Sequence, residues 1–293
     1  MKLLLFGANG QVGSEIVKQA QAAGIDLVAC SRAQVDITKQ QSVADIITLE
    51  QPSIVINAAA YTAVDQAEND QESAYAVNAM APGYIASACA EAGIPLLHIS
   101  TDYVFDGNKD APYIEADAVQ PLNCYGRSKL EGENVIRERL DQHIILRTSW
   151  VFGAAGNNFV KTIVRLAKER EQLKVVDDQH GCPTPAAYIA DALLVISKAI
   201  DSDNESAWGT YHYCGAPPTS WYSFAQKIVA IAQGYVTLKI QQLLPIPSEQ
   251  YPTPAPRPRN TVLHCDKIRE QFGIMPPDWE QALRELFESG AIQ

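Results

Sequence analysis

A tyrosine and a lysine stand four residues apart in the segment Tyr125-Gly-Arg-Ser-Lys129. On a helix this spacing puts both side chains on one face, so a phenol and an amine can reach the same bound molecule. The reduction of a ketone needs a hydride and a proton for the developing alkoxide, and a tyrosine hydroxyl can supply that proton. Such a pair is more often only the surface of an amphipathic helix. It therefore predicts a reductase only if the chain also binds a hydride donor.

A glycine-rich turn, Gly7-Ala-Asn-Gly10-Gln-Val-Gly13, follows an apolar run near the start of the chain. Small residues permit a tight turn and let the backbone approach a pyrophosphate at the N-terminus of the following helix. Because the turn leaves a first strand and opens a helix within a strand-helix-strand unit, it predicts a dinucleotide site. A nicotinamide dinucleotide would supply the hydride that the tyrosine and lysine lack.

The tyrosine must also have a suitable pKa. An unperturbed phenol has a pKa of about 10, and lowering it to near 7 takes about 4 kcal/mol. We expect Lys129 and the positive charge of the oxidised nicotinamide to supply this stabilisation, and Lys129 also to hold the nicotinamide ribose. A strand that ends in Ser100-Thr101-Asp102-Tyr103 adds a third hydroxyl to the set.

The end of the second predicted strand bears on the choice of cofactor. The residues there are Ser31 and Arg32, and an arginine fork suits the 2'-phosphate of NADPH. The alternative is a solvated surface arginine, and use of NADH stays open. Asp36 either bonds the adenine amine or starts the loop into the next helix, and it is predicted to contact the cofactor together with Ile37.

The spacing of apolar residues predicts the elements that position these groups. Short apolar runs alternate with segments of helical period, which predicts strands at residues 3–6, 26–30, 53–57, 95–100 and 143–148 and helices that include 72–92 and 125–140. Near-continuous apolar strands that alternate with helices are typical of a parallel sheet covered on both faces. The predicted fold class is α/β, a doubly wound parallel sheet of Rossmann type.

The pattern loosens after Phe152. Helices are expected near residues 159–171, 186–200, 221–232 and 278–288, and the proline-rich stretch 245–258 disfavours regular structure. We predict a dinucleotide-binding Rossmann domain over residues 1–152. Residues 153–293 are predicted to form mainly a substrate-binding lobe that interleaves with the end of the sheet.

Composition narrows the range of partners. The formal net charge is −11 and no basic stripe is present, which argues against nucleic acid or an anionic membrane surface as the main partner. No apolar run approaches the length that spans a bilayer. The six cysteines are scattered without a CxxC pair, which is typical of a reduced, cytoplasmic protein.

Further motifs carry a resemblance to a known family. They are Asn57-Ala-Ala-Ala-Tyr-Thr-Ala-Val-Asp65, Val77-Asn78-Ala-Met-Ala-Pro82, Ile99-Ser-Thr-Asp-Tyr-Val-Phe-Asp-Gly107, Arg147-Thr-Ser-Trp150-Val-Phe-Gly153, Gly181-Cys-Pro-Thr184 and Arg257-Pro-Arg-Asn260. With the glycine turn and the Tyr/Lys pair, they resemble the extended short-chain dehydrogenase/reductase superfamily and, within it, the dTDP-4-dehydrorhamnose reductase family. The resemblance covers nearly the whole chain. It implies NADPH-dependent reduction of the C4 ketone of dTDP-4-dehydro-L-rhamnose.

The resemblance also implies roles for individual residues. Thr101, Tyr125 and Lys129 would be catalytic, with Thr101 in the role that other members give to serine. Asn9, Gln11 and Val12 would line the pyrophosphate, and Ala60 and Thr62 would flank the adenosine half of the cofactor. Substrate contacts would come from Asp102, Tyr103 and Trp150. Apart from the resemblance, arginine suits bidentate pyrophosphate contacts, so Arg257 or Arg259 in the proline-rich loop either holds the dTDP or is a solvated loop arginine. Asn78 is expected to steady the site through backbone bonds.

Three questions stay open at this point. Some family members are described as magnesium-linked dimers, and Glu15 matches a position associated with that, so Mg²⁺ and a homodimer are both undecided. A nucleotide-sugar epimerase or dehydratase shares the cofactor turn and the Tyr/Lys pair but retains its nicotinamide. A non-catalytic regulatory subunit, resembling that of methionine adenosyltransferase, is a second alternative, against which the intact Thr101, Tyr125 and Lys129 argue.

Overall fold

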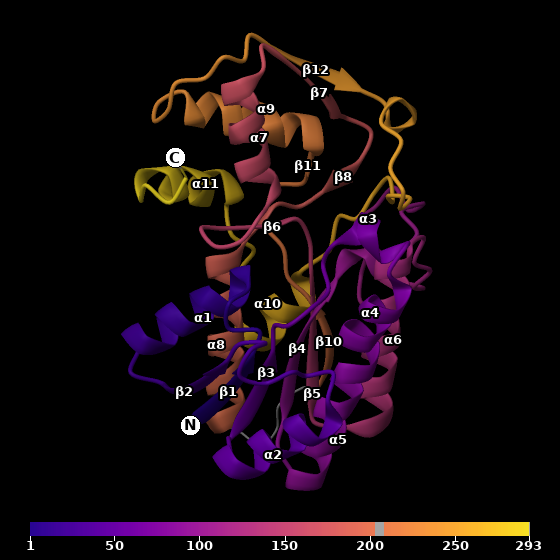
Figure 1. The fold of residues 1–293 in the computed structure, drawn as a ribbon, viewed down its shortest axis with the longest axis vertical. Coiled ribbons are helices and arrows are strands. Elements are labelled where there is room, and N and C mark those ends of the chain that lie inside the picture. The colour runs from indigo at the N-terminus through magenta and orange to yellow at the C-terminus, as the bar shows by residue number, and fades with distance from the viewer. Residues whose placement is uncertain (203–207, 293) are drawn as a thin grey trace.

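The computed structural model describes residues 1–202 and 208–292, and a parallel sheet lies at the centre of the larger lobe (Figure 1). The sheet has six strands in the order β10-β5-β4-β3-β1-β2, and every neighbouring pair is parallel. The strands are β1 (Lys2–Phe6), β2 (Asp26–Cys30), β3 (Ile54–Asn57), β4 (Leu96–Thr101), β5 (His143–Thr148) and β10 (Gly209–His212). Strand order reverses between β1 and β3, where ligands bind in folds of this kind.

Helices cover both faces of this sheet, as near-continuous apolar strands require. On one face α1 (Gln11–Ala22), α8 (Ala186–Ser202) and α10 (Asp266–Phe272) pack on Leu3 and Leu5. On the other face α2 (Gln40–Glu50), α5 (Ala81–Ala92) and α6 (Cys124–Arg139) pack on Leu4 and Phe6. Alternate residues of β1 therefore face opposite cores. The predicted doubly wound fold is confirmed.

One predicted helix is interrupted. Residues 72–92 form α4 (Gln71–Tyr75), a π-helical turn η1 (Ala76–Met80) and α5, instead of one continuous helix. The wider turn contains Asn78, whose amide bonds both the N–H and the carbonyl of Tyr61. These hydrogen bonds satisfy a buried amide, and the spacing of apolar residues in the sequence does not reveal them. π-Helical turns occur frequently at functional sites. Short helices α3 (Val64–Ala67) and η2 (Asp102–Val104) complete this side of the lobe.

The smaller lobe has its own apolar core. It is built from α7 (Phe159–Glu169), α9 (Trp221–Ala232), α11 (Trp279–Glu288) and the paired strands β7 (Gln172–Val176) and β12 (Gln242–Ile246). Two short pairs, β6 (Val151–Phe152) with β9 (Thr184–Pro185) and β8 (His180–Gly181) with β11 (Thr219–Ser220), lead into it. The proline-rich stretch contains the end of β12 and the short helix η3 (Ser248–Gln250).

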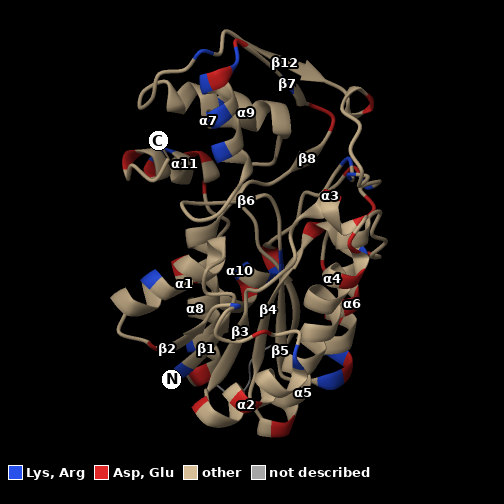
Figure 2. Cartoon of the chain, in the orientation of Figure 1, with Lys and Arg blue, Asp and Glu red and all other residues tan. Residues whose placement is uncertain are grey.

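The later part of the chain contributes to both lobes. Strand β10 extends the sheet beside β5, and α8 packs against α1, although both follow residue 152 in sequence. Neither β10 nor α10 was predicted, because each is short and lacks a clear apolar period. No helix in the described ranges is long and apolar enough to cross a membrane. Basic and acidic residues lie side by side on α6 and α7 (Figure 2).

Candidate active site

A cavity of about 710 Å³ opens at the carboxyl ends of the sheet strands, between the two lobes. It runs from the loop after β2, past the glycine turn, to Tyr125 and Trp221. The predicted site residues that line it are Gly7, Asn9, Gly10, Gln11, Val12, Arg32, Asp36, Ile37, Ala60, Thr62, Thr101, Asp102, Tyr103, Tyr125, Lys129 and Trp150. The other residues that were predicted to act at the site do not line it, and these are Gly13, Ser31, Asn78, Arg257 and Arg259.

The glycine turn is too tightly packed for side chains. Gly7 has a φ of +86°, and a Cβ there would lie 2.6 Å from the backbone nitrogen of Ala59. A Cβ on Gly13 would lie 2.1 Å from the Gly7 carbonyl oxygen, so Gly13 acts by letting α1 approach β1. Gly10 caps α1 without a side-chain hydrogen bond, which leaves the first N–H groups of the helix free for an anion. These residues therefore fit a dinucleotide pyrophosphate.

The side chains beside the glycine turn differ in how they are held. Asp36 accepts hydrogen bonds from the backbone and hydroxyl of Thr38, which lowers the pKa of its carboxyl. The Ser31 hydroxyl donates to the side-chain oxygen of Gln34, and Ser31 does not line the cavity. Arg32 is exposed at the cavity rim and has no ion pair within the described residues.

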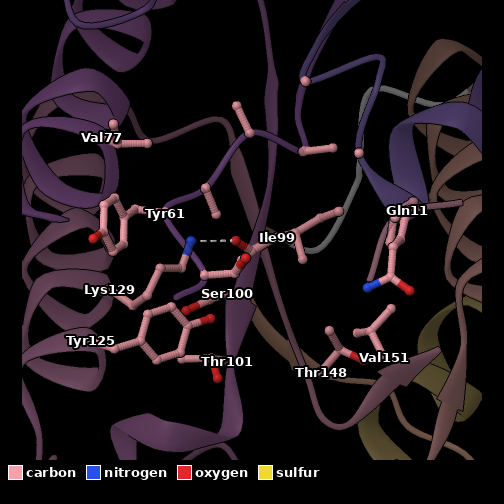
Figure 3. A pocket seen from close by; sticks show the side chains of 18 of the residues that line it. Gln11, Tyr61, Val77, Ile99, Ser100, Thr101, Tyr125, Lys129, Thr148 and Val151 are labelled. Carbon is pink, nitrogen blue, oxygen red and sulfur yellow. Dashed lines mark hydrogen bonds between the residues drawn. The ribbon is translucent and has the colours of Figure 1, made fainter. Parts of the chain in front are cut away.

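Thr101 and Tyr125 meet at the inner end of the cavity. The Thr101 hydroxyl accepts a hydrogen bond from the Tyr103 backbone N–H at 3.2 Å and donates one to Asp102 Oδ1 at 3.0 Å. The Tyr125 ring points toward Thr101 from the first turn of α6 (Figure 3). Burial raises the pKa of Tyr125 to about 12, and hydrogen bonding with Thr101 only partly offsets it. The sequence predicted a lowered pKa for Tyr125, but in the cofactor-free chain this pKa is raised instead.

Lys129 lies one turn after Tyr125, and its amine points away from the phenol. Its side chain is only 1% exposed, and Nζ donates to the carbonyl oxygen of Ile99 at 2.7 Å (Figure 3). The same nitrogen lies 3.2 Å from Nε2 of His98. Burial lowers the pKa of Lys129 to about 8, although the nearby Glu133 carboxylate raises it. Because the Lys129 amine is directed to Ile99 and His98, it does not offset the effect of burial on the pKa of Tyr125.

The carboxyl group of Asp102 is almost completely buried. It is 2% exposed, and its Oδ2 has no hydrogen-bond partner among the described residues. Burial raises the pKa of this carboxyl to about 7, while the Thr261 and Thr101 hydroxyls oppose the rise. Neither hydroxyl bonds Oδ2 with hydrogen-bonding geometry. The carboxyl can therefore be a donor as well as an acceptor near neutral pH.

Two tryptophans, Trp150 and Trp221, also line the cavity. Trp150 has a φ of +44°, an uncommon conformation for a bulky residue, and its ring stacks on Trp221 at a centroid distance of 3.4 Å. Gly181 packs against the same indole, and a Cβ there would lie 2.5 Å from it. Trp221 was not predicted as a site residue. Its position directly after Ser220, which caps α9, identifies it only as a helix start.

The arginines of the proline-rich loop lie outside this cavity. Arg257 forms a two-pronged ion pair with Asp65, at 2.5 Å and 2.9 Å, and its side chain is 18% exposed. Arg259 lines a separate cavity of about 480 Å³ with Lys109 and His180. The motif that includes Asp65 was recognised, but the pairing of its carboxylate with Arg257 was not.

The candidate metal position offers no cluster of ligands. The Glu15 carboxylate oxygen Oε2 lies 3.8 Å from Lys18 Nζ in the same helix, α1. Within residues 1–202 and 208–292 there is no group of three or more His, Cys, Asp or Glu side chains that could hold a metal ion.

Comparison with known proteins places this geometry in a family. The model for the RmlD substrate binding domain matches residues 1–292. A curated dTDP-4-dehydrorhamnose reductase of Burkholderia thailandensis is 44% identical, with 97% of each chain covered. The chain belongs to the dTDP-4-dehydrorhamnose reductase family. The prediction that it is an oxidoreductase of this family is confirmed.

Solved structures of dTDP-4-dehydrorhamnose reductases share the whole fold. The Clostridium acetobutylicum protein matches with a TM-score of 0.92 and 37% identity over 100% of both chains. The Bacillus anthracis protein, solved in complex with NADP, matches with a TM-score of 0.89 and 37% identity over 99% of this chain and 100% of that one. A Thermus thermophilus UDP-glucose 4-epimerase has a TM-score of 0.81 at 18% identity and shares the fold alone.

Proposed function

We propose that this chain reduces the C4 ketone of dTDP-4-dehydro-L-rhamnose with NADPH and so forms dTDP-L-rhamnose, the last step of dTDP-rhamnose synthesis. The observation that carries the proposal is the meeting of Thr101, Tyr125 and Lys129 in one cavity with the glycine turn, in a chain of this family. The Bacillus anthracis relative was solved with NADP, which supports the cofactor. The exposed guanidinium of Arg32 at the cavity rim suits a 2'-phosphate.

The bound cofactor supplies the hydride, and the chain supplies the proton. A pKa of about 12 keeps the Tyr125 phenol protonated at neutral pH, so it can donate its proton to the oxygen at C4 as negative charge develops there. Thr101, whose oxygen accepts from the Tyr103 N–H, can donate to the same oxygen once its hydrogen leaves Asp102 Oδ1. Lys129 orients the ribose of the cofactor by hydrogen bonding.

The remaining contacts concern the sugar and the diphosphate. The stacked indoles of Trp150 and Trp221 offer an apolar wall for one face of the sugar ring. The unpartnered Oδ2 of Asp102 is placed to bond a sugar hydroxyl. Arg257 pairs with Asp65 and also interacts with Tyr103, which lines the cavity, so its proposed bond to the diphosphate is made from the edge of the cavity.

The test is NADPH absorbance with purified protein and dTDP-4-dehydro-L-rhamnose, beside the 4-keto-D-glucose precursor as the control substrate. We expect oxidation of NADPH in stoichiometric amounts with the L-rhamno substrate. A cofactor that copurifies and does not exchange would favour the epimerase alternative. NADPH binding without turnover, joined to an effect on another enzyme's activity, would favour the regulatory subunit.

A further inference from the structure

Two hydrogen-bond donors meet on one oxygen atom in the turn after β2. The backbone N–H of Ser31 lies 2.9 Å from Gln34 Oε1, and the Ser31 hydroxyl lies 2.7 Å from the same atom. A backbone N–H can only donate, so the Gln34 amide must present its oxygen here, and the hydroxyl must donate to it as well. Gln34 is exposed and has no part in the reaction proposed above.

These donors belong to the segment that contacts the adenosine ribose in dinucleotide-binding folds, because they directly follow the second strand of the sheet. Arg32, the next residue, lines the cavity, whereas Ser31 and Gln34 do not. A guanidinium, a hydroxyl and a backbone N–H are the kinds of donor that a phosphate accepts from. In the cofactor-free chain, two of these three donors are already bonded to an amide of the chain itself.

The Gln34 oxygen is neutral, and this decides which cofactor can replace it. Hydrogen bonds to an ionised acceptor are roughly twice as strong as those between neutral groups, so a phosphate can displace the amide, whereas the free 2'-hydroxyl of NADH cannot. We propose that Gln34 is a specificity-determining residue, which competes with the 2'-phosphate of NADPH for the two Ser31 donors and so reduces the preference for NADPH over NADH. This inference rests on the proposed use of NADPH.

The charges around the turn are independent of Gln34. Asp36 accepts hydrogen bonds from the backbone and hydroxyl of Thr38, which lower the pKa of its carboxyl, and the cations of Lys39 and Arg32 lower it further. Two cations therefore lie close to a carboxylate that is already bonded within the chain. A change of the Gln34 side chain to a neutral one leaves all of these charges in place.

The shape of the turn is also independent of the Gln34 side chain. The Ser31 carbonyl oxygen accepts from the backbone N–H of Gln34 at 3.1 Å and from that of Val35 at 3.0 Å. Val35 is buried in the apolar core on the α2 face of the sheet. Truncation of Gln34 should therefore free the two Ser31 donors without moving them.

The experiment is calorimetric titration with adenosine 2',5'-bisphosphate and with 5'-AMP, which differ only in the 2'-phosphate. We expect Gln34→Ala to bind the bisphosphate about three- to tenfold more tightly than the wild type, since the ligand no longer competes for a hydrogen bond, and to bind 5'-AMP with little change. In Ser31→Ala, which lacks one of the contested donors, the gain from Gln34→Ala should be smaller. Gln41→Ala is the matched control, because Gln41 is exposed, bonds Asp45 and does not line the cavity.

The sign of the change in Gln34→Ala decides the proposal. Weaker binding of the bisphosphate would show that Gln34 is itself a ligand of the phosphate, and unchanged binding would show that it does not compete. An equal gain for both ligands would assign the effect to the adenosine, and each of these three results would overturn the proposal.

A second measurement needs no variant. The ¹⁵N–¹H signal of the Ser31 amide in the wild type should shift more with the bisphosphate than with 5'-AMP, and equal shifts would contradict the proposal. Neither measurement involves hydride transfer. A chain that reduces no keto-sugar can therefore still support this inference, and a chain with normal turnover can still refute it.

Discussion

Replacing Asp102 with asparagine should increase the free energy of unfolding, and only at pH values above about 4, where the unfolded carboxyl ionises. The wild-type carboxyl has a pKa of about 7 in the folded chain against 3.8 for the ordinary group, because it is buried with one oxygen unpartnered. In the unfolded chain the group ionises near pH 4, while the folded chain keeps the proton until about pH 7. The folded state therefore binds more protons in this window, and wild-type stability falls as pH rises through it.

The magnitude follows from the size of the shift. About three pKa units at 1.36 kcal/mol each give about 4 kcal/mol of stability lost by pH 8 relative to a neutral side chain. An amide matches the shape of the protonated carboxyl, and its oxygen can still accept from Thr101. We expect Asp102→Asn and the wild type to be nearly equal at pH 4, with the variant ahead by up to about 4 kcal/mol at pH 8.

The assay is urea unfolding of the wild type and the variant at several pH values from 4 to 8.5. Asp178→Asn serves as the control of opposite sign, because hydrogen bonds from Ser248 lower the pKa of that carboxyl and its loss should destabilise the chain at neutral pH. A stability difference between Asp102→Asn and the wild type that does not change with pH would refute the reasoning. Turnover of the stabilised variant should fall if Oδ2 bonds the substrate.

Three further changes test other parts of the site. Tyr125→Phe should leave NADPH affinity unchanged in a fluorescence titration while reducing kcat by about 100-fold or more, and near-normal turnover would remove the phenol from the mechanism. Arg32→Ala should weaken NADPH binding more than NADH binding, and equal losses would show that the guanidinium does not contact the 2'-phosphate. Gly132→Ala should destabilise the chain in thermal unfolding although alanine favours helices by about 1 kcal/mol, because its Cβ would lie 2.0 Å from the Asn78 carbonyl oxygen. The exposed Glu131→Ala, beside it on α6, should be nearly neutral.

The sequence predicts the first half of the fold closely because local signals agree there. Strand β2 and strand β5 begin and end where the apolar runs do, and the glycine turn lies where α1 packs closely against the end of β1. Strand β10 escaped prediction because Gly209 to His212 has little apolar character of its own. Its place is decided by the free edge of β5, which is a tertiary property.

The candidate site also contains residues that the sequence reveals and residues that only the fold brings together. Thr101, Tyr125 and Lys129 could be found because motifs place them at strand and helix ends. Trp221 could not, because only the fold brings the start of α9 against Trp150. The direction of the Tyr125 pKa was missed because proximity to Lys129 in sequence does not reveal that the amine turns to Ile99 and His98.

The interleaved order of the two lobes has a consequence for how the protein is made. A nascent chain that has reached residue 152 contains the glycine turn, Thr101, Tyr125 and Lys129, yet the edge of β5 and the sheet face under α8 are still bare. Those surfaces are closed only by residues 186–202 and 209–212, and α10 follows at 266–272. The cofactor pocket should therefore mature late, close to release from the ribosome. Truncation between the lobes should then yield an aggregating fragment instead of a free dinucleotide-binding domain.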